Sequence, residues 1–166
     1  MKHKLNLSKH IAALICLGFA LLVAAPVASA NSAFLNYAGR YAAAPSDLPA
    51  QVQIAVQAAN KLEGKPYVWG GGHKFLEDRG YDCSGSVSYA LHGGGLLSSP
   101  EDSTGLESFG EPGPGKYITI YADAEHAFMV IDGKRFDTVA LAETGNRWSG
   151  SMTSTAGFVA RHPEGL

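Results

Sequence analysis

The chain is poor in cysteine, in net basic charge and in long apolar runs, and each shortage excludes a class of protein. It has two cysteines and no Cys-x-x-Cys pair, which argues against a zinc ribbon or a dithiol redox motif. Its 13 lysines and arginines face 15 aspartates and glutamates, so the basic excess typical of nucleic-acid-binding proteins is missing. We find no internal repeat and no appended binding module.

The N-terminus has the layout of a secretory signal peptide. Three lysines precede an uncharged apolar run at residues 11–25, and a proline and an Ala-Ser-Ala site at residues 28–30 follow it. The run is shorter than the roughly 20 residues that span a bilayer, which disfavours the alternative of a membrane anchor. We therefore expect residues 1–30 to be removed by cleavage after Ala30. Cys16 lies in the middle of the run and would be discarded with it.

The remaining chain is acidic and long enough for one domain. Residues 1–30 contain three of the 13 basic residues and none of the 15 acidic ones, so five more acidic than basic residues remain. Nucleic acid is therefore not an expected partner. We expect a lead-in segment at residues 31–48, where the residues show no periodic pattern. A single domain is expected at residues 49–166.

Two helices are predicted in the first half of this domain. Residues 49–62 have apolar side chains at helical spacing, among them Val52, Ile54 and Ala55, with a proline at the start. The second helix is predicted to begin at Cys83 and to stop at the glycines of residues 93–95.

Cys83 is the only cysteine left after signal removal, and its position favours reactivity. An unpaired thiol in an exported protein indicates a reactive site or intermolecular pairing, whereas an ordinary core cysteine has no need of a helix start. Free N–H groups and the helix dipole at that start favour the thiolate, which is the nucleophilic form. Asp82 or Ser84 can cap the same turn. We predict that Cys83 is a catalytic nucleophile.

A general base and an orienting residue are predicted from a hairpin. A strand is expected at residues 117–121, and a second apolar strand begins at His126. Asp132-Gly133 is a strong two-residue turn signal between that strand and residues 134–138. With such a turn His126 opposes Val139, and Asp137 lies diagonal to His126 on the same face. Asp137 could then orient the imidazole of His126.

The other histidines are weaker candidates. His162 follows a predicted closing strand at residues 158–161 and is the rival for the orienting role, although a surface position near the C-terminus is the simpler interpretation. His73 in the glycine-rich loop and His92 late in the second helix are expected to be peripheral. A zinc site of Cys83 with histidines is disfavoured because no short ligand spacing appears, and we expect neither metal nor cofactor.

Residues 64–138 resemble the NlpC-type cell-wall peptidases. The resemblance rests on Tyr67-Val68-Trp69-Gly70-Gly71, on Asp82-Cys83-Ser84-Gly85 at a helix start, and on His126 at the start of a later strand. Relatives usually have Gly-His-Val-Gly around the histidine, where this chain has Glu125-His126-Ala127-Phe128. The third catalytic position, often histidine in relatives, would fall on Asp137.

The resemblance implies a papain-like α+β fold, with N-terminal helices packed on an antiparallel sheet and the nucleophile at a helix start. It implies hydrolysis of peptidoglycan stem peptides, typically between D-γ-glutamyl and a diamino acid, by a secreted or periplasmic, cell-wall-associated enzyme. Cys83, His126 and Asp137 would be catalytic, and Tyr67, Asp82 and Ser84 would line the substrate side. Helix capping by Asp82 or Ser84 and core packing of Tyr67 or Trp69 are alternatives. An amidase or acyltransferase with the same Cys-His pair, or a non-catalytic wall-binding module, also remains open.

Overall fold

The computed structural model describes residues 36–38 and 40–166. The expected signal peptide at residues 1–30 lies outside the described residues. Within the described part of the chain, no helix has both the length and the apolar character needed to cross a membrane. The predicted lead-in, residues 31–48, contains a small antiparallel sheet of β1 (Asn36–Ala38) and β2 (Tyr41–Ala43).

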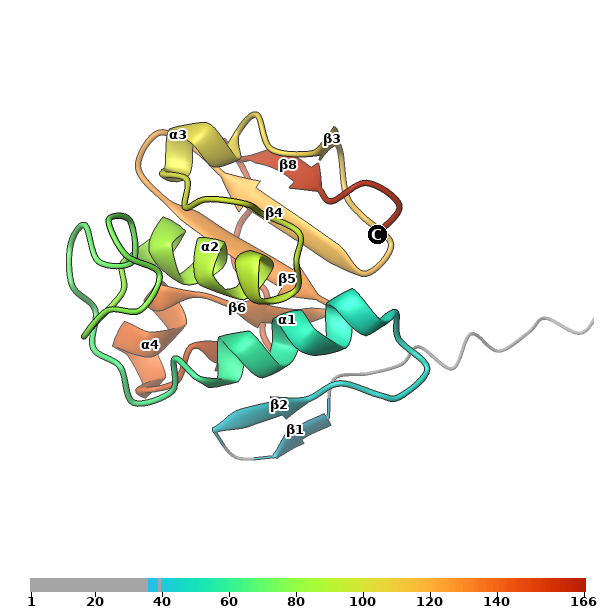
Figure 1. Ribbon diagram of the computed structural model, residues 1–166, viewed down its shortest axis with the longest axis horizontal. Helices are drawn as coiled ribbons and strands as arrows, with labels where there is room; N and C mark the ends of the chain where they lie inside the picture. The colour runs from blue at the N-terminus through green and yellow to red at the C-terminus, as the bar shows by residue number, and fades with distance from the viewer. Residues whose placement is uncertain (1–35, 39) are drawn as a thin grey trace, which may run out of the picture.

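A six-stranded antiparallel sheet forms the centre of the fold, in the order β3-β8-β4-β5-β6-β7. Figure 1 shows helices α1 and α2 lying side by side across one face of this sheet. The α+β class implied by the sequence resemblance is therefore confirmed, and the arrangement is compatible with a papain-like fold. The strands are β3 (Glu111–Pro112), β4 (Ile118–Ala122), β5 (Ala127–Ile131), β6 (Lys134–Phe136), β7 (Trp148–Ser149) and β8 (Val159–His162).

Helix α1 (Ala50–Asn60) follows the predicted pattern with one exception. Val52 and Ala55 are fully buried against the rest of the core, and Val56 joins them, but Ile54 is 46% exposed. Ile54 lies off this buried face because it is two positions from Val52 and Val56, about 200° round the helix from each. The end of α1 is tied to β2, since the Asn60 side chain bonds both the N–H and the carbonyl of Ala42.

Helix α2 (Cys83–Gly93) is buried over most of its length. Its apolar face includes Val87, Ala90 and Leu91, which pack into the core. Fully burying a side chain such as Leu91 stabilises a fold by roughly 1.5–3 kcal/mol. Gly93 lies so close to Ala58 of α1 that a side-chain carbon there would collide with it, so glycine lets the two helices approach.

The hairpin of β5 and β6 has the predicted two-residue turn. Ile131 pairs with Lys134, and both turn residues, Asp132 and Gly133, have positive φ. That conformation is typical of the type I′ turn, whose twist suits a hairpin. The predicted register is therefore confirmed as far as β6 extends.

The second strand of the hairpin is shorter than predicted. Strand β6 ends at Phe136, and Thr138 begins helix α4 (Thr138–Thr144). The predicted pairing of His126 with Val139 is therefore wrong. The Asp137 carboxylate caps α4 by accepting from the N–H of Val139, and this helix start removes the following residues from the sheet.

Candidate active site

The start of α2 is built around the carboxylate of Asp82. This residue is the N-cap, and its Oδ1 accepts from the N–H of Gly85 at 2.8 Å, so the capping alternative is realised by Asp82 and not by Ser84. A side-chain carbon on Gly85 would collide with the carbonyl oxygen of Gly71. The glycine thus allows the loop before α2 to pack on its first turn. Cys83 follows the cap directly and is 7% exposed.

His126 lies at the end of the loop that connects β4 to β5. The carboxylate of Asp123 accepts from the N–H of Glu125 and from that of His126, and the N–H of Asp123 donates to the carbonyl of His126. This local network fixes the backbone of the loop just before β5 begins at Ala127. The imidazole is about one-fifth exposed.

The imidazole of His126 contacts Asp137. Its Nε2 lies 3.0 Å from Oδ1 of Asp137, which is 2% exposed. The other carboxylate oxygen, Oδ2, accepts from Nη1 of the buried Arg135 at 2.6 Å. The diagonal contact expected from the turn is therefore present, although Asp137 reaches it from the start of α4 and not from a strand.

Aromatic rings surround His126 on the side of the sheet. Phe128 stacks on the imidazole at a centroid separation of 6.1 Å, and Phe158 meets it edge-on at 6.2 Å. Phe128 also stacks on Tyr121 of β4. The stacking of the two rings shows that His126 and Phe128, two positions apart along the chain, lie on the same face of the sheet.

Cys83 and His126 perturb each other's protonation. Burial by itself would raise the pKa of the Cys83 thiol, but hydrogen bonds from His126 and from the N–H of Ala127, together with the charge of His126, bring the pKa below its ordinary value. Burial likewise opposes the charging of His126. Hydrogen bonds to Asp137 and Cys83 outweigh it and raise the pKa of His126 to about 9. The two groups therefore favour a thiolate–imidazolium pair.

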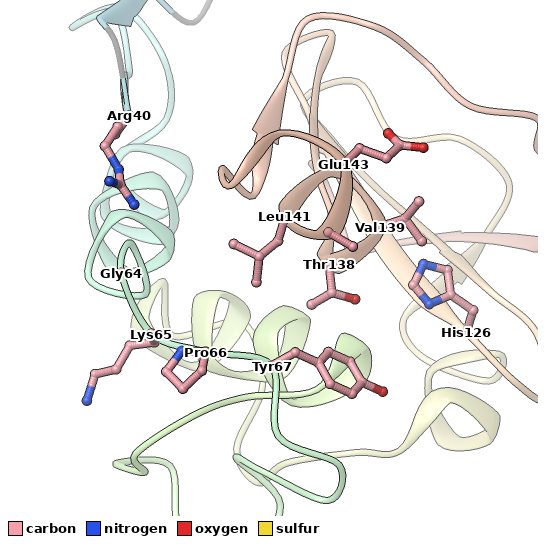
Figure 2. A pocket seen from close by; sticks show the side chains of 11 residues that line it. Arg40, Gly64, Lys65, Pro66, Tyr67, His126, Thr138, Val139, Leu141 and Glu143 are labelled. Atoms are coloured by element: carbon pink, nitrogen blue, oxygen red, sulfur yellow. The ribbon is translucent and has the colours of Figure 1, made fainter.

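Two cavities flank this pair. The first, of about 650 Å³, lies between α4 and residues 64–67 and has His126 at one end (Figure 2). The second, of about 460 Å³, is lined by Cys83, Ser84 and Trp69 together with the start of α3 (Ser103–Leu106). The candidate base thus lines one cavity and the candidate nucleophile lines the other.

The carboxylate of Asp82 is largely occupied by the protein itself. Besides the cap, its Oδ2 accepts from the N–H of Gly70 at 2.9 Å, and Nε2 of His73 lies 2.9 and 3.0 Å from its two oxygens. Ser84 Oγ is 3.3 Å from the same histidine nitrogen. His73, expected to be peripheral to catalysis, lines the cavity of Cys83. Only the folding of the glycine-rich loop brings it there.

The aromatic residues of this loop, Tyr67 and Trp69, are exposed and line the two cavities. Trp69 is 81% exposed at the rim of the second cavity, so the expectation of core packing is wrong for it. Tyr67 is 46% exposed and lines the first cavity. Burial, then the charges of Cys83 and Asp82, raise the pKa of Tyr67.

The segment that carries Tyr67 is tied to the core by Arg147, which is fully buried. Its Nη1 donates to the carbonyls of Leu62 and Lys65, and its Nε lies 3.3 Å from Oγ of Ser86 on α2. Sequence reasoning did not single out Arg147 or Arg135. Neither forms part of a recognisable motif, since each acts through contacts that exist only in the folded chain.

The remaining histidines contact other groups. His162 bonds the carbonyl of Gly113 and lies 3.3 Å from Glu111 of β3, and His92 bonds the carbonyl of Leu97. Among the residues that the structure describes, no group of three or more His, Cys, Asp or Glu side chains is arranged to hold a metal ion.

The chain matches no protein-family model. Two proteins named probable endopeptidase, from Mycobacterium bovis and Mycobacterium tuberculosis, are each 39% identical to it over 82 residues, which is 46% of this chain and 20% of the relative. Peptidoglycan endopeptidase RipB from Mycobacterium tuberculosis is 30% identical over 128 residues, which is 63% of this chain and 52% of RipB. The chain therefore matches between a fifth and about half of the length of these relatives.

Proposed function

We propose that the protein is an exported cysteine endopeptidase that hydrolyses amide bonds in the stem peptides of peptidoglycan. The observation that carries the proposal is the contact series from Cys83 through His126 to Asp137, with a lowered pKa at the thiol and a raised one at the imidazole. A wall-binding module without catalysis has no need of such a series. The names of the relatives, which contain the words endopeptidase and peptidoglycan, support the same reaction and substrate.

The geometry suits nucleophilic catalysis by the thiolate. Sγ of Cys83 attacks the carbonyl carbon of the amide, and the first-turn N–H groups and dipole of α2 stabilise the negative charge that develops. The imidazolium of His126 gives its proton to the departing amine, which leaves a thioester on Cys83. Neutral His126 then takes a proton from water, which attacks the thioester and releases the acid.

Asp137 is proposed to orient the imidazole in both steps. Its Oδ1 accepts from Nε2 of His126, which leaves Nδ1 for the thiol, and its negative charge favours the imidazolium. The ion pair with Arg135 holds the other oxygen in place. His162 is bonded to Gly113 and Glu111 and is therefore not the proposed orienting residue.

The bond between D-γ-glutamyl and a diamino acid is the proposed site of cleavage, on the strength of the NlpC-type resemblance. Tyr67, Asp82 and Ser84 remain proposed on the substrate side. Since His73 and two N–H groups already occupy Asp82, a substrate amine would have to share its carboxylate with His73. Export is proposed with cleavage after Ala30, which N-terminal sequencing of the secreted protein would check.

Digestion of purified peptidoglycan followed by mass spectrometry tests the function. We expect fragments that end in D-glutamate, matched by new free amines on the diamino acid, and no products with Cys83→Ala. Release of other fragments would indicate an amidase instead, and transfer of acyl groups to an added amine would indicate an acyltransferase. An intact wall after incubation with untreated protein, whose Cys83 a parallel iodoacetamide titration shows to be reactive, would contradict the proposal.

A further inference from the structure

The second cavity, which Cys83 lines, is rich in hydroxyl and carboxylate groups. The residues that supply them are Asp82, Ser84, Asp102, Ser103, Thr104 and Glu125. Among the described residues that line this cavity, none is a lysine or an arginine. A ligand held here finds acceptors for its own N–H and O–H groups and meets no strong cation that would attract a phosphate or a carboxylate. The lining therefore suits a neutral ligand with many hydroxyl and amide groups.

The buried carboxylate of this lining is not open to a substrate ammonium. Asp82 accepts from the N–H groups of Gly70 and Gly85, and Nε2 of His73 lies within 3.0 Å of both of its oxygens. The other two carboxylates, those of Asp102 and Glu125, are exposed, so water and salt screen their charge. Recognition in this cavity therefore does not depend on a free amine at the acyl end of the substrate.

Trp69 stands at the rim of the same cavity on a fixed backbone. The N–H of Val68 donates to the carbonyl of Tyr81, and the N–H of Gly70 donates to the carboxylate of Asp82. Both neighbours of Trp69 are thus tied to the residues just before the nucleophile, yet Trp69 itself is 81% exposed. The fold holds a large, flat, apolar ring beside Cys83 and leaves it uncovered.

The polar part of the lining is fixed as well. Oγ of Ser103 at the start of α3 donates to the carbonyl of Ala124, in the loop before His126. The segment that leads into α3 is tied to α2, because the N–H of Glu101 donates to Oγ of Ser88. The aromatic ring and the polar groups are therefore placed before any ligand arrives, which lowers the cost of binding.

A pyranose ring matches this combination of groups. One face of the ring presents mainly C–H groups, which pack on an aromatic side chain, and its edge carries hydroxyl and N-acetyl groups, which bond to carboxylates and hydroxyls. In peptidoglycan the first residue of each stem peptide is joined to such a sugar. Under the proposed mechanism the acyl part of the substrate stays on Cys83, and this part leads towards the sugar.

We propose that Trp69 stacks on the amino sugar that carries the stem peptide, so that the protein selects stems still joined to the glycan over free peptides. The inference rests on the proposed function. It gives the exposed indole a ligand, and it makes the occupied state of Asp82 part of the selection, because a peptide with a free amine has no open buried anion to bind.

Three substrates with the same scissile bond test the inference. They are L-Ala-D-γ-Glu-diaminopimelate with a free amine, the same peptide acylated with lactate, and the same peptide joined to N-acetylmuramic acid. The lactyl peptide has neither the amine charge nor the sugar. We expect kcat/KM for the muramyl peptide to be about tenfold above that for the lactyl peptide, the effect of covering roughly 50 Å² of apolar surface. A free peptide cut as fast as the muramyl peptide would overturn the inference.

Substitutions in the loop locate the preference. Trp69→Ala should remove the difference between the muramyl and lactyl peptides, and Trp69→Phe should keep part of it. Phe75→Ala is the matched control, because Phe75 is 63% exposed in the same loop and is not among the described residues that line the cavity. It should keep the whole preference. A preference that survives in folded Trp69→Ala overturns the inference.

Fluorescence quenching tests the contact without turnover. The chain has two tryptophans, and Trp148 is only 2% exposed, so quenching by acrylamide reports mainly on Trp69. In Cys83→Ala the muramyl peptide should lower the quenching constant, and the lactyl peptide should lower it less. Equal protection by the two peptides overturns the inference. If the muramyl peptide protects Trp69 but the unsubstituted protein cuts none of the three substrates, the proposed function fails and the contact with the sugar stands.

Discussion

The starts of α2 and α4 use the same local device with different partners. Each helix is capped by a buried aspartate, Asp82 or Asp137, that accepts from a first-turn N–H and from a histidine ring. The histidine at Asp82 is His73, whose ring nitrogen also lies 3.3 Å from a serine hydroxyl. The histidine at Asp137 is His126, which interacts with a thiol.

Because only one of the two histidines interacts with a thiol, a capped helix with an aspartate–histidine pair is not by itself a catalytic unit. At α4 the aspartate charge favours an imidazolium next to Cys83, which lowers the pKa of the thiol. At α2 the charge of Asp82 has the opposite effect and raises the pKa of the same thiol. The two carboxylates thus act on Cys83 with opposite signs.

Loss of Asp137 should have the largest effect. Asp137→Ala should lower kcat/KM by about a thousandfold or more, since an unoriented imidazole loses its tautomer and its charge. His162→Ala should change it by less than about twofold. Thermal unfolding of both variants is needed, because a buried carboxylate paired with Arg135 also stabilises the fold. If kcat/KM falls strongly in His162→Ala and stays nearly unchanged in Asp137→Ala, the orienting residue is misassigned.

The pH dependence of activity should reflect the coupled pair. The thiolate forms as pH rises through the lowered pKa of Cys83, and His126 loses the proton needed by the leaving amine as pH rises through about 9. Activity should therefore rise at a pH below the ordinary thiol value of about 8.5 and fall near pH 9. Rates of peptide cleavage measured across these pH values check both the rise and the fall of activity. A single rise centred at or above 8.5 would exclude the ion pair.

The opposite signs of the two carboxylates can be measured on the thiol directly. The midpoint of Cys83 alkylation against pH should move up in Asp137→Ala and down in Asp82→Asn, because the first change weakens the imidazolium and the second removes a negative charge near the thiolate. The side-chain oxygen that Asp82→Asn retains can still accept from the N–H of Gly85, so the cap should remain and stability should change by no more than about 1 kcal/mol. Shifts of the same sign in both variants would remove the distinction between the two helix starts.

His73→Gln should have the smallest effect. The backbone N–H groups of Gly70 and Gly85 still hold Asp82 in this variant, so we expect stability to change by less than about 1 kcal/mol. Turnover should change by no more than about threefold if His73 only covers the carboxylate. Chemical denaturation and peptide cleavage provide the two readouts. A loss comparable to that of Asp137→Ala would make the α2 pair catalytic as well.

Local patterns predicted those parts of the site that depend on short-range rules. A helix start at Cys83 followed from the cap and the glycines after the helix, and the register of β5 and β6 followed from the Asp-Gly turn. The contact between His126 and Asp137 was predicted through that register. The end of β6 was missed because a cap at Asp137 competes with continued strand pairing, and the turn rule contains no information about that competition.

The sequence by itself determined the candidate nucleophile and the hairpin, because helix caps, turn geometry and apolar periodicity act over a few residues. The α+β class was implied by the resemblance to the NlpC-type peptidases. Only the tertiary structure decided that His73 meets Asp82 and that Trp69 lies outside the core. The tertiary structure also creates the two cavities, since the first is bounded by Arg40, residues 64–67 and α4. Segments so far apart in the chain meet only through packing of the whole core, which no local pattern encodes.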